Sequence, residues 1–249
     1  MCFHTSISHP TRKIEQQLKV TLSDDKFRPL FDTPNYHLNG FSHPNMLLIP
    51  QEKSEILAPG VWGIVPTHKS KEDIKPYYKE AVKYGGGLNA RSEKLFEHFI
   101  YKNSIFNQRC VIPVSGFFEP HDQNKKKYPF YFKNGDDNLL CLAGIYTKID
   151  TYITFTILTK KASPLFEKVH NLKRRQPVII NDTELGNWLS SDLNEDDIMS
   201  IINKDYPESK LETYPVSKEL FSPKTDSNVV ASIQKQDYPE LALSLLFDN

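Results

Sequence analysis

The segment LLCLAGIYTKIDTYITFTIL, residues Leu139–Leu158, decides the predicted fold. Two runs rich in β-branched and aromatic residues, 139–146 and 152–158, are joined by a short polar link that contains Lys148 and Asp150. This spacing is typical of an antiparallel β-hairpin. The sequence therefore predicts a sheet that is at least partly antiparallel.

Further strand and helix signals lie on both sides of this hairpin. Helices are expected to begin at Ser92, Asp182 and Asn194, each a plausible N-cap residue, and to lie at the periphery. No internal repeat or long Gly/Ser linker divides the chain, which favours one α+β domain over residues 1–249. The other predicted strands are Val61–Val65, Cys110–Phe118, Tyr128–Phe132 and Val178–Ile180.

Composition excludes several classes of protein. The chain has 249 residues, of which 39% are hydrophobic and 25% charged, so wholesale disorder is excluded. Charge-free stretches such as Tyr152–Thr159 are under half the ~20 apolar residues that a membrane span needs. The N-terminus lacks the basic-then-apolar run of a secretory signal. We therefore expect a cytoplasmic monomer that has no membrane partner.

Charge is balanced overall but uneven along the chain. The 31 Lys and Arg residues equal the 31 Asp and Glu residues, so no whole-protein field attracts nucleic acid. Residues 160–175 are nevertheless basic, and residues 182–212 are acidic. The basic stretch is either a binding site for a short polyanion or an ordinary solvated face.

The three cysteines do not form a metal-binding pattern. No Cys-x-x-Cys pair or zinc-finger spacing is present, so neither a metal nor a cofactor is predicted. Cys110 and Cys141 lie in apolar strand-like runs, where a thiol usually behaves as a small buried hydrophobe.

Cys2 differs from the other two cysteines in its possible reactivity, because removal of Met1 would leave a free α-amine and a thiol on one residue. An α-amine has a pKa of about 7.7–8.0, so near neutrality part of it is unprotonated and can attack an aldehyde. The adjacent thiol can then close a thiazolidine ring. The alternative is an accidental cysteine at a frayed terminus.

Three further stretches carry candidate polar groups. Asn89 and Arg91 precede the helix expected at Ser92, where a helix N-terminus could hold a phosphate, although ordinary capping explains them equally well. Glu119 ends an apolar strand, where desolvation suits a carboxylate to proton transfer; a solvated rim residue is the alternative. His170 precedes the basic cluster and is a candidate base or hydrogen-bond donor, or simply structural.

Taken together, these elements resemble the SOS response-associated peptidase (SRAP) family, whose members shield abasic sites in single-stranded DNA. The resemblance runs from Cys2 to about Ile180 and leaves 181–249 as a helical or irregular C-terminal part. The blocks that carry it are Met1-Cys2, Val61-Trp-Gly-Ile-Val-Pro66, Leu88-Asn-Ala-Arg-Ser-Glu93, Arg109-Cys-Val-Ile-Pro-Val-Ser-Gly-Phe-Phe-Glu119, Leu142-Ala-Gly-Ile-Tyr146, Phe155-Thr-Ile-Leu-Thr159, and His170 with Arg175-Gln-Pro-Val-Ile-Ile180.

The resemblance implies a curved, barrel-like, mostly antiparallel sheet with peripheral helices. It implies that Cys2 is the nucleophile, which forms a thiazolidine crosslink with the aldehyde of an abasic site after Met1 is removed. Asn89, Glu119 and His170 would be its active-site partners. Removal of Met1 by the protein itself and strand cleavage through an imine are further implied activities. The residues expected near DNA are His4, Arg91, Thr159, Lys173, Arg174 and Arg175.

The chain departs from the family pattern at three places. The usual Cys-Gly-Arg start is Cys2-Phe3-His4, which leaves His4 in the position of a DNA-contacting arginine. The usual Glu-Trp pair is Glu119-Pro120, so Phe118 or Tyr128 would have to supply base stacking. An insertion at residues 171–174 adds Lys173 and Arg174 after His170.

Two other functions stay open at this stage. An N-terminal-nucleophile hydrolase or peptidase would use Cys2 to cleave a small amide with turnover. A non-covalent binder of single-stranded DNA would not depend on Cys2 at all.

Overall fold

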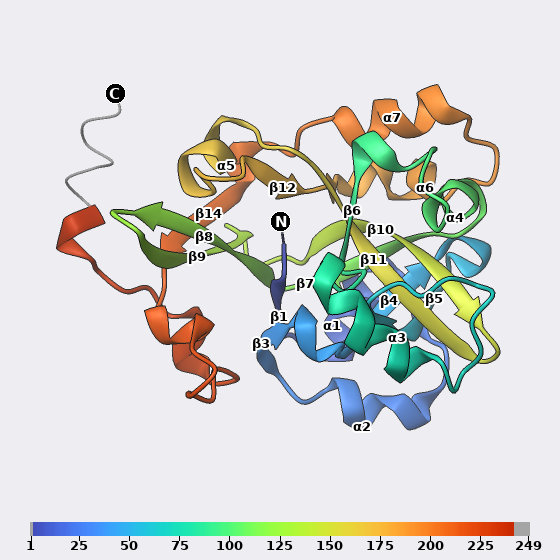
Figure 1. The fold of residues 1–249 in the computed structure, drawn as a ribbon, viewed down its shortest axis with the longest axis horizontal. Coiled ribbons are helices and arrows are strands. Elements are labelled where there is room, and N and C mark those ends of the chain that lie inside the picture. Colours follow the sequence, from blue (N-terminus) through green and yellow to red (C-terminus); the bar gives the residue numbers. More distant parts are fainter. Residues whose placement is uncertain (1, 242–249) are drawn as a thin grey trace.

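The computed structural model describes residues 2–241 of the chain (Figure 1). Its strands are β1 (His4–Ile7), β2 (Thr21–Leu22), β3 (Asn35–Asn39), β4 (Asn45–Pro50), β5 (Ile56–Trp62), β6 (Asn89–Arg91), β7 (Arg109–Val114), β8 (Gly116–Gln123), β9 (Lys126–Asn134), β10 (Leu140–Ile149), β11 (Tyr152–Lys161), β12 (Arg175–Pro177), β13 (Ile179–Ile180) and β14 (Leu211–Pro215). The α-helices are α1 (Thr11–Leu18), α2 (Arg28–Phe31), α3 (Ile74–Ala81), α4 (Tyr101–Asn107), α5 (Pro164–Val169), α6 (Leu185–Trp188) and α7 (Glu195–Asn203).

A closed barrel forms the centre of the fold. Strands β5, β4, β7, β10 and β11 pair in that order through antiparallel ladders, and a parallel pairing of β11 with β5 closes the ring. Closure leaves these strands without a free edge and fills the interior with side chains such as Trp62, Ile112 and Phe155, all fully buried. The predicted α+β fold with a barrel-like, mostly antiparallel sheet is confirmed.

The hairpin predicted from the sequence is β10–β11, with Ile149 paired to Tyr152 across the turn. Asp150 adopts a left-handed backbone conformation in that turn, at φ 54°. A fully buried Gly144–Ile157 pair lies further along the ladder. The two apolar runs and the polar link between them therefore determine both the partner strand and the direction of pairing.

A second sheet lies beside the barrel and contains the N-terminal strand. Its strand order is β14-β9-β8-β1-β3, so β1 lies between β8 and β3 (Figure 1). The sequence predicted one strand over Cys110–Phe118, but the structure divides it at Ser115 into β7 of the barrel and β8 of the second sheet. Gly116 permits this corner because a Cβ atom there would lie 2.5 Å from the carbonyl oxygen of Phe132.

The helix predicted at Ser92 is wrong. Residues 89–91 instead form strand β6, which pairs in parallel with β11, and Ser92–Lys94 form a single 3₁₀ turn. The prediction at Asn194 is correct, because its side chain caps α7 in a reciprocal capping box with Asp197. At Asp182 a 3₁₀ turn leads into the short helix α6.

Candidate active site

Cys2 lies at the point where the N-terminal strand leaves the second sheet. Strand β1 pairs with β8 in the register His4 to Phe118, which brings the residue two positions earlier beside Glu119 and Pro120. Cys2 is fully buried, and its Sγ lies 3.8 Å from the carbonyl oxygen of His4. Burial, and secondarily the nearby Glu119 carboxylate, raise the pKa of the Cys2 thiol well above its usual value.

Glu119 and His170 form a buried pair next to this cysteine. Glu119 is fully buried on β8, and His170, which ends α5, is 3% exposed. His170 Nδ1 lies 3.1 Å from Glu119 Oε2 and 2.9 Å from the carbonyl oxygen of Arg175. A carbonyl oxygen can only accept a hydrogen bond, so Nδ1 carries a proton and Nε2 is the nitrogen that can exchange one with a substrate.

Asn89 lies on β6, held by the parallel pairing of Asn89 with Ile157 of β11. Its amide oxygen and nitrogen are both buried and make no hydrogen bond within residues 2–241. Buried amide groups normally have hydrogen-bond partners, so this amide can donate to and accept from a bound group. The neighbouring Leu88 packs near Gly40, whose backbone N–H donates to the carbonyl oxygen of Phe3 at 2.8 Å, so this strand lies close to the N-terminal segment.

Three of the residues expected near DNA gather on adjacent strands. Arg91 is exposed and Thr159 is its register partner across β6 and β11. The Arg175 guanidinium donates to the Thr159 carbonyl oxygen at 2.8 Å and to the Glu93 carboxylate. Thr159 is fully buried, and Arg175 is already paired, so of this group Arg91 presents the most open cation.

The inserted residues after His170 form an ordered turn. The backbone N–H of Arg174 donates to the His170 carbonyl oxygen at 2.9 Å, and Arg174 has a left-handed φ of 48°. Asn171 anchors the turn by exchanging two hydrogen bonds with the Asp122 backbone, at 2.7 and 3.0 Å. Lys173 and Arg174 are therefore held at the surface beside His170, with both side chains exposed.

The basic stretch predicted from the sequence is smaller in the structure. Lys160 is 6% exposed and donates to the Lys204 carbonyl oxygen and to Asp205, each at 2.8 Å. This lysine therefore ties β11 to the acidic C-terminal part and cannot serve as a surface cation.

His4 belongs to a hydrogen-bonded chain that the sequence did not reveal. His4 Nδ1 lies 2.9 Å from His37 Nε2, and His37 Nδ1 lies 2.6 Å from the Ser227 hydroxyl. Burial, with the His37 charge as a second cause, lowers the pKa of His4 to about 3, and burial lowers the pKa of His37 to about 4. Both imidazoles are therefore neutral near pH 7, and His4 brings no positive charge to the position of the family's arginine.

This pair predicts a pH dependence of stability. Histidines in the unfolded chain titrate near 6.5, so below that pH the unfolded state binds more protons than the folded state. The contribution of the His4–His37 pair to the free energy of unfolding is fully present above about pH 6.5 and is lost as the pH falls toward 4. Urea unfolding at pH 7.5 and 5.0 measures how much the free energy of unfolding decreases between these two pH values. This decrease should be smaller for a His4→Phe, His37→Gln variant than for wild type. Equal losses would contradict the prediction.

The aromatic residues proposed to replace the family's tryptophan are not available for stacking. Phe118 is fully buried against Tyr131, and Tyr128 is 2% exposed and packs edge-on against Tyr238. Phe41, which follows β3, is instead 42% exposed and contacts Phe3 with a ring separation of 5.0 Å. No motif marked Phe41 in the sequence.

The part of the chain that the structure describes holds neither a metal-binding cluster nor a membrane-spanning helix. Among residues 2–241 no group of three or more His, Cys, Asp and Glu side chains could hold a metal ion. Over the same range no helix is long and apolar enough to cross a bilayer.

The arrangement has the chemistry of an N-terminal-cysteine site. An enclosed cysteine at position 2 lies beside a buried carboxylate–imidazole pair and near a buried amide without a partner in residues 2–241. Such a set can attack an electrophilic carbon and move protons to and from it.

Comparison with known proteins gives the family. Residues 1–223 match the family model described as SOS response associated peptidase (SRAP), so the chain belongs to the SRAP family. The abasic site processing protein YoqW of Bacillus subtilis (strain 168) is 32% identical over 172 residues, 67% of this chain and 71% of that protein. The abasic site processing protein YMR114C of Saccharomyces cerevisiae is 26% identical over 238 residues, 92% of this chain and 60% of that one.

A solved structure has the same fold. The crystal structure of a protein from Bacteroides thetaiotaomicron matches with a TM-score of 0.82 at 26% identity, and the match covers 95% of this chain and 100% of that one. The resemblance predicted from the sequence motifs is thus confirmed at the level of family and fold.

Proposed function

We propose that this protein shields abasic sites in single-stranded DNA by a covalent thiazolidine link to Cys2, formed after Met1 has been removed. The observation that carries the proposal is the buried Glu119–His170 pair, 3.1 Å apart, beside a fully buried cysteine at the second position. Membership of a family whose relatives are named abasic site processing proteins supports the same substrate.

The proposed reaction begins at the open-chain aldehyde of the abasic deoxyribose. The Cys2 α-amine adds to the carbonyl carbon and gives a carbinolamine, which takes up one proton and loses one water to become an iminium ion. The thiol sulfur then bonds to the same carbon, its proton leaves, and the ring closes. The raised pKa keeps the thiol protonated, so the amine reacts first and the thiol needs a base to take its proton.

Glu119 and His170 supply the proton transfers that this sequence of steps needs. The carboxylate of Glu119 is close enough to raise the pKa of the Cys2 thiol and so is placed to accept the thiol proton. His170 Nε2 is the ring nitrogen left for the substrate, because Nδ1 is held by Glu119 and by the Arg175 carbonyl oxygen; it would open the sugar ring or protonate the leaving hydroxyl. The buried Asn89 amide would orient the Cys2 terminus.

The same groups can act in related steps. Reversal of ring closure would release DNA, and the imine would permit strand cleavage by β-elimination. Hydrolysis of the Met1–Cys2 peptide bond, which consumes one water and frees the Cys2 α-amine, would remove Met1 and account for a peptidase activity.

Replacing either proton carrier should slow the reaction more than it weakens binding. We expect Glu119→Gln and His170→Ala each to slow adduct formation or reversal by roughly 100-fold or more, the scale of general acid–base help. DNA affinity should change by less than about tenfold. The yield at long times should approach wild type, because proton carriers change barriers and leave the closed ring equally stable. Single-turnover time courses with excess protein measure this, and a wild-type rate for His170→Ala would make His170 structural.

The exposed cations after His170 should contribute to salt-sensitive binding. Each contacted phosphate on a single strand lowers log K by about 0.7 per unit of log salt. The Lys173→Ala, Arg174→Ala double variant should therefore show a shallower salt dependence than wild type. Because the turn is held by Asn171 and backbone bonds, the variant should keep its fold. An unchanged slope would make these residues an ordinary solvated face.

A denaturing gel tests the proposed function directly. The protein should form a heat-stable adduct with single-stranded DNA that carries one abasic site, and none with the intact strand. Turnover of a small amide without any adduct would instead indicate an N-terminal-nucleophile hydrolase. Binding without an adduct would indicate a non-covalent binder.

A further inference from the structure

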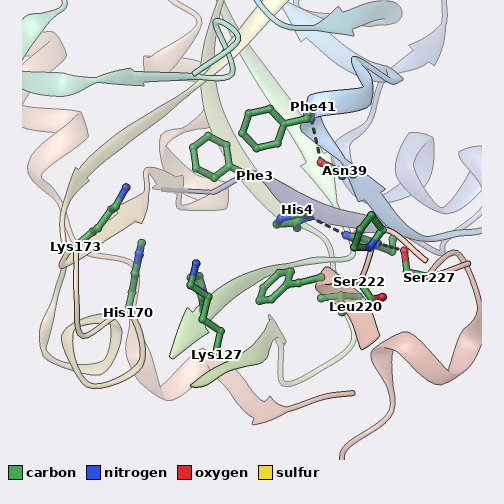
Figure 2. Close-up of a pocket in the computed structure, with 14 residues that line it drawn as sticks. Phe3, His4, Asn39, Phe41, Lys127, His170, Lys173, Leu220, Ser222 and Ser227 are labelled. Carbon is green, nitrogen blue, oxygen red and sulfur yellow. Dashed lines mark hydrogen bonds between the residues drawn. The ribbon is translucent and has the colours of Figure 1, made fainter. Parts of the chain in front are cut away.

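A cavity of about 430 Å³ opens beside the candidate active site, within the size range of about 300–1,000 Å³ that small-ligand sites occupy. His170 and Pro120 line it on the side of the proposed chemistry, and Figure 2 shows the His170 side chain at this border. Phe3 and His4 from the N-terminal segment, together with His37 and Phe41 around β3, form other walls. The cavity therefore adjoins the candidate active site through His170.

The C-terminal part of the chain closes this cavity. Leu220, Phe221 and Ser227 line it, and they come from the segment after β14. The Asn228 side chain accepts hydrogen bonds from the backbone N–H groups of Tyr36 and His37, at 2.8 and 3.3 Å. With the His37–Ser227 bond, these contacts fix the wall against β3, so the cavity is a built feature of the fold.

Three phenylalanine rings, Phe3, Phe41 and Phe221, line the cavity. Phe3 and Phe41 lie 5.0 Å apart at an interplanar angle of 34°, and His4 lies 4.9 Å from the Phe221 ring at 48°. Figure 2 shows Phe3 and Phe41 on one side of the space and Lys127 on the other. Open aromatic faces of this kind stack with nucleobases of any sequence.

The polar edge of the cavity can change its hydrogen-bonding character. His37 Nε2 contacts His4 Nδ1, so His4 Nε2 is the ring nitrogen left to meet a ligand. If Ser227 donates to His37, His4 Nε2 carries a proton and is a donor; if the chain of bonds reverses, His4 Nε2 is an acceptor. Both imidazoles stay neutral near pH 7, because their pKa values are about 3 and 4. The edge therefore suits a group that offers either a donor or an acceptor.

Two lysines stand at the rim. Lys127 of β9 and Lys173 of the inserted turn both line the cavity and are both exposed. They lie on the same side as His170 (Figure 2). Phosphates that flank a group bound in the cavity would meet these cations.

We propose that this cavity receives the nucleobase next to the abasic residue, stacked on Phe41 and Phe221, with its edge hydrogen-bonded to His4. This inference rests on the proposed function, because it takes the reacting deoxyribose at Cys2 as the anchor. It adds a second requirement on the substrate, an intact base on one side of the lesion. It also gives residues 218–228 a role in binding.

The test compares single strands that carry one reactive abasic site. One strand has bases on both sides, and two others replace either the 5′ or the 3′ neighbouring base by tetrahydrofuran, a stable sugar without a base. Affinity is measured by fluorescence anisotropy in a Cys2→Ala background, so that no stable thiazolidine forms and the measured binding is reversible. Adduct formation on the same strands is measured with Cys2 intact.

One of the two substituted strands should bind about 5- to 150-fold more weakly than the full strand, the range that one base–aromatic stack supplies. Phe41→Ala and Phe221→Ala should each weaken binding of the full strand and remove most of the difference in affinity between the strands. His4→Phe should reduce this difference. Phe99→Ala, an aromatic residue 66% exposed and outside the cavity lining, is the matched control and should keep the difference.

Equal affinity for all three strands, with adducts on each, would overturn the base pocket and leave the proposed function intact. The base pocket would also be overturned if Phe41→Ala and Phe221→Ala keep the full difference in affinity. Base-dependent binding without an adduct on any strand would support the pocket and overturn the proposed chemistry.

Discussion

Cys2→Ala is expected to abolish the heat-stable adduct with abasic single-stranded DNA, with no product on a denaturing gel even at long times. Alanine keeps the α-amine but has no sulfur to close the ring, so only a reversible imine remains. Cys2 is fully buried, and removing one atom there should preserve the fold and non-covalent binding.

Cys141→Ala is the matched control for this variant. Cys141 is also buried, on β10, and takes no part in the proposed site, so its variant should crosslink like wild type. If Cys2→Ala crosslinks as well as wild type, an imine of the α-amine or of a lysine carries the crosslink and the thiazolidine account is wrong.

An uncleaved extension before Cys2 should have an effect of the same size. The extension converts the α-amine into an amide, which cannot form an imine, while the thiol and the Glu119–His170 pair stay in place. We expect such a protein to bind abasic DNA and to form no adduct. Cleaving the extension with a protease that leaves Cys2 as the first residue should restore the reaction. A reactive uncleaved protein would contradict the role of the α-amine.

The sequence pattern predicted the barrel hairpin correctly, because the residues that determine this hairpin are neighbours in the sequence. Strands β10 and β11 are joined by a two-residue turn, so the register follows from the chain itself. The same pattern failed at Ser92, where polar residues before an apolar run resemble a helix start. There the backbone of Asn89–Arg91 pairs with β11, a contact about 68 residues away in sequence that no local signal encodes.

In the candidate site, too, residues in local motifs were predicted and residues joined only by long-range contacts were not. Cys2, Glu119 and His170 were predicted because each stands in a distinct motif; the structure brings Glu119 next to both the cysteine and the histidine, and their catalytic roles stay predictions. His37 and Ser227 were missed, since they are joined only by a contact across 190 residues. The packing of the C-terminal part against β3 was missed for the same reason, because polar, proline-containing segments are interpreted as loops until their hydrogen bonds are seen.

Mapping the crosslink to a residue tests the central claim most directly. The wild-type protein is reacted with abasic single-stranded DNA without any reductant, heated, and digested with trypsin and nuclease, and the modified peptide is sequenced by mass spectrometry. The account predicts that the peptide begins at Cys2, lacks Met1, and carries the deoxyribose on Cys2 itself. A deoxyribose on a lysine side chain, or on a peptide that still contains Met1, would contradict it.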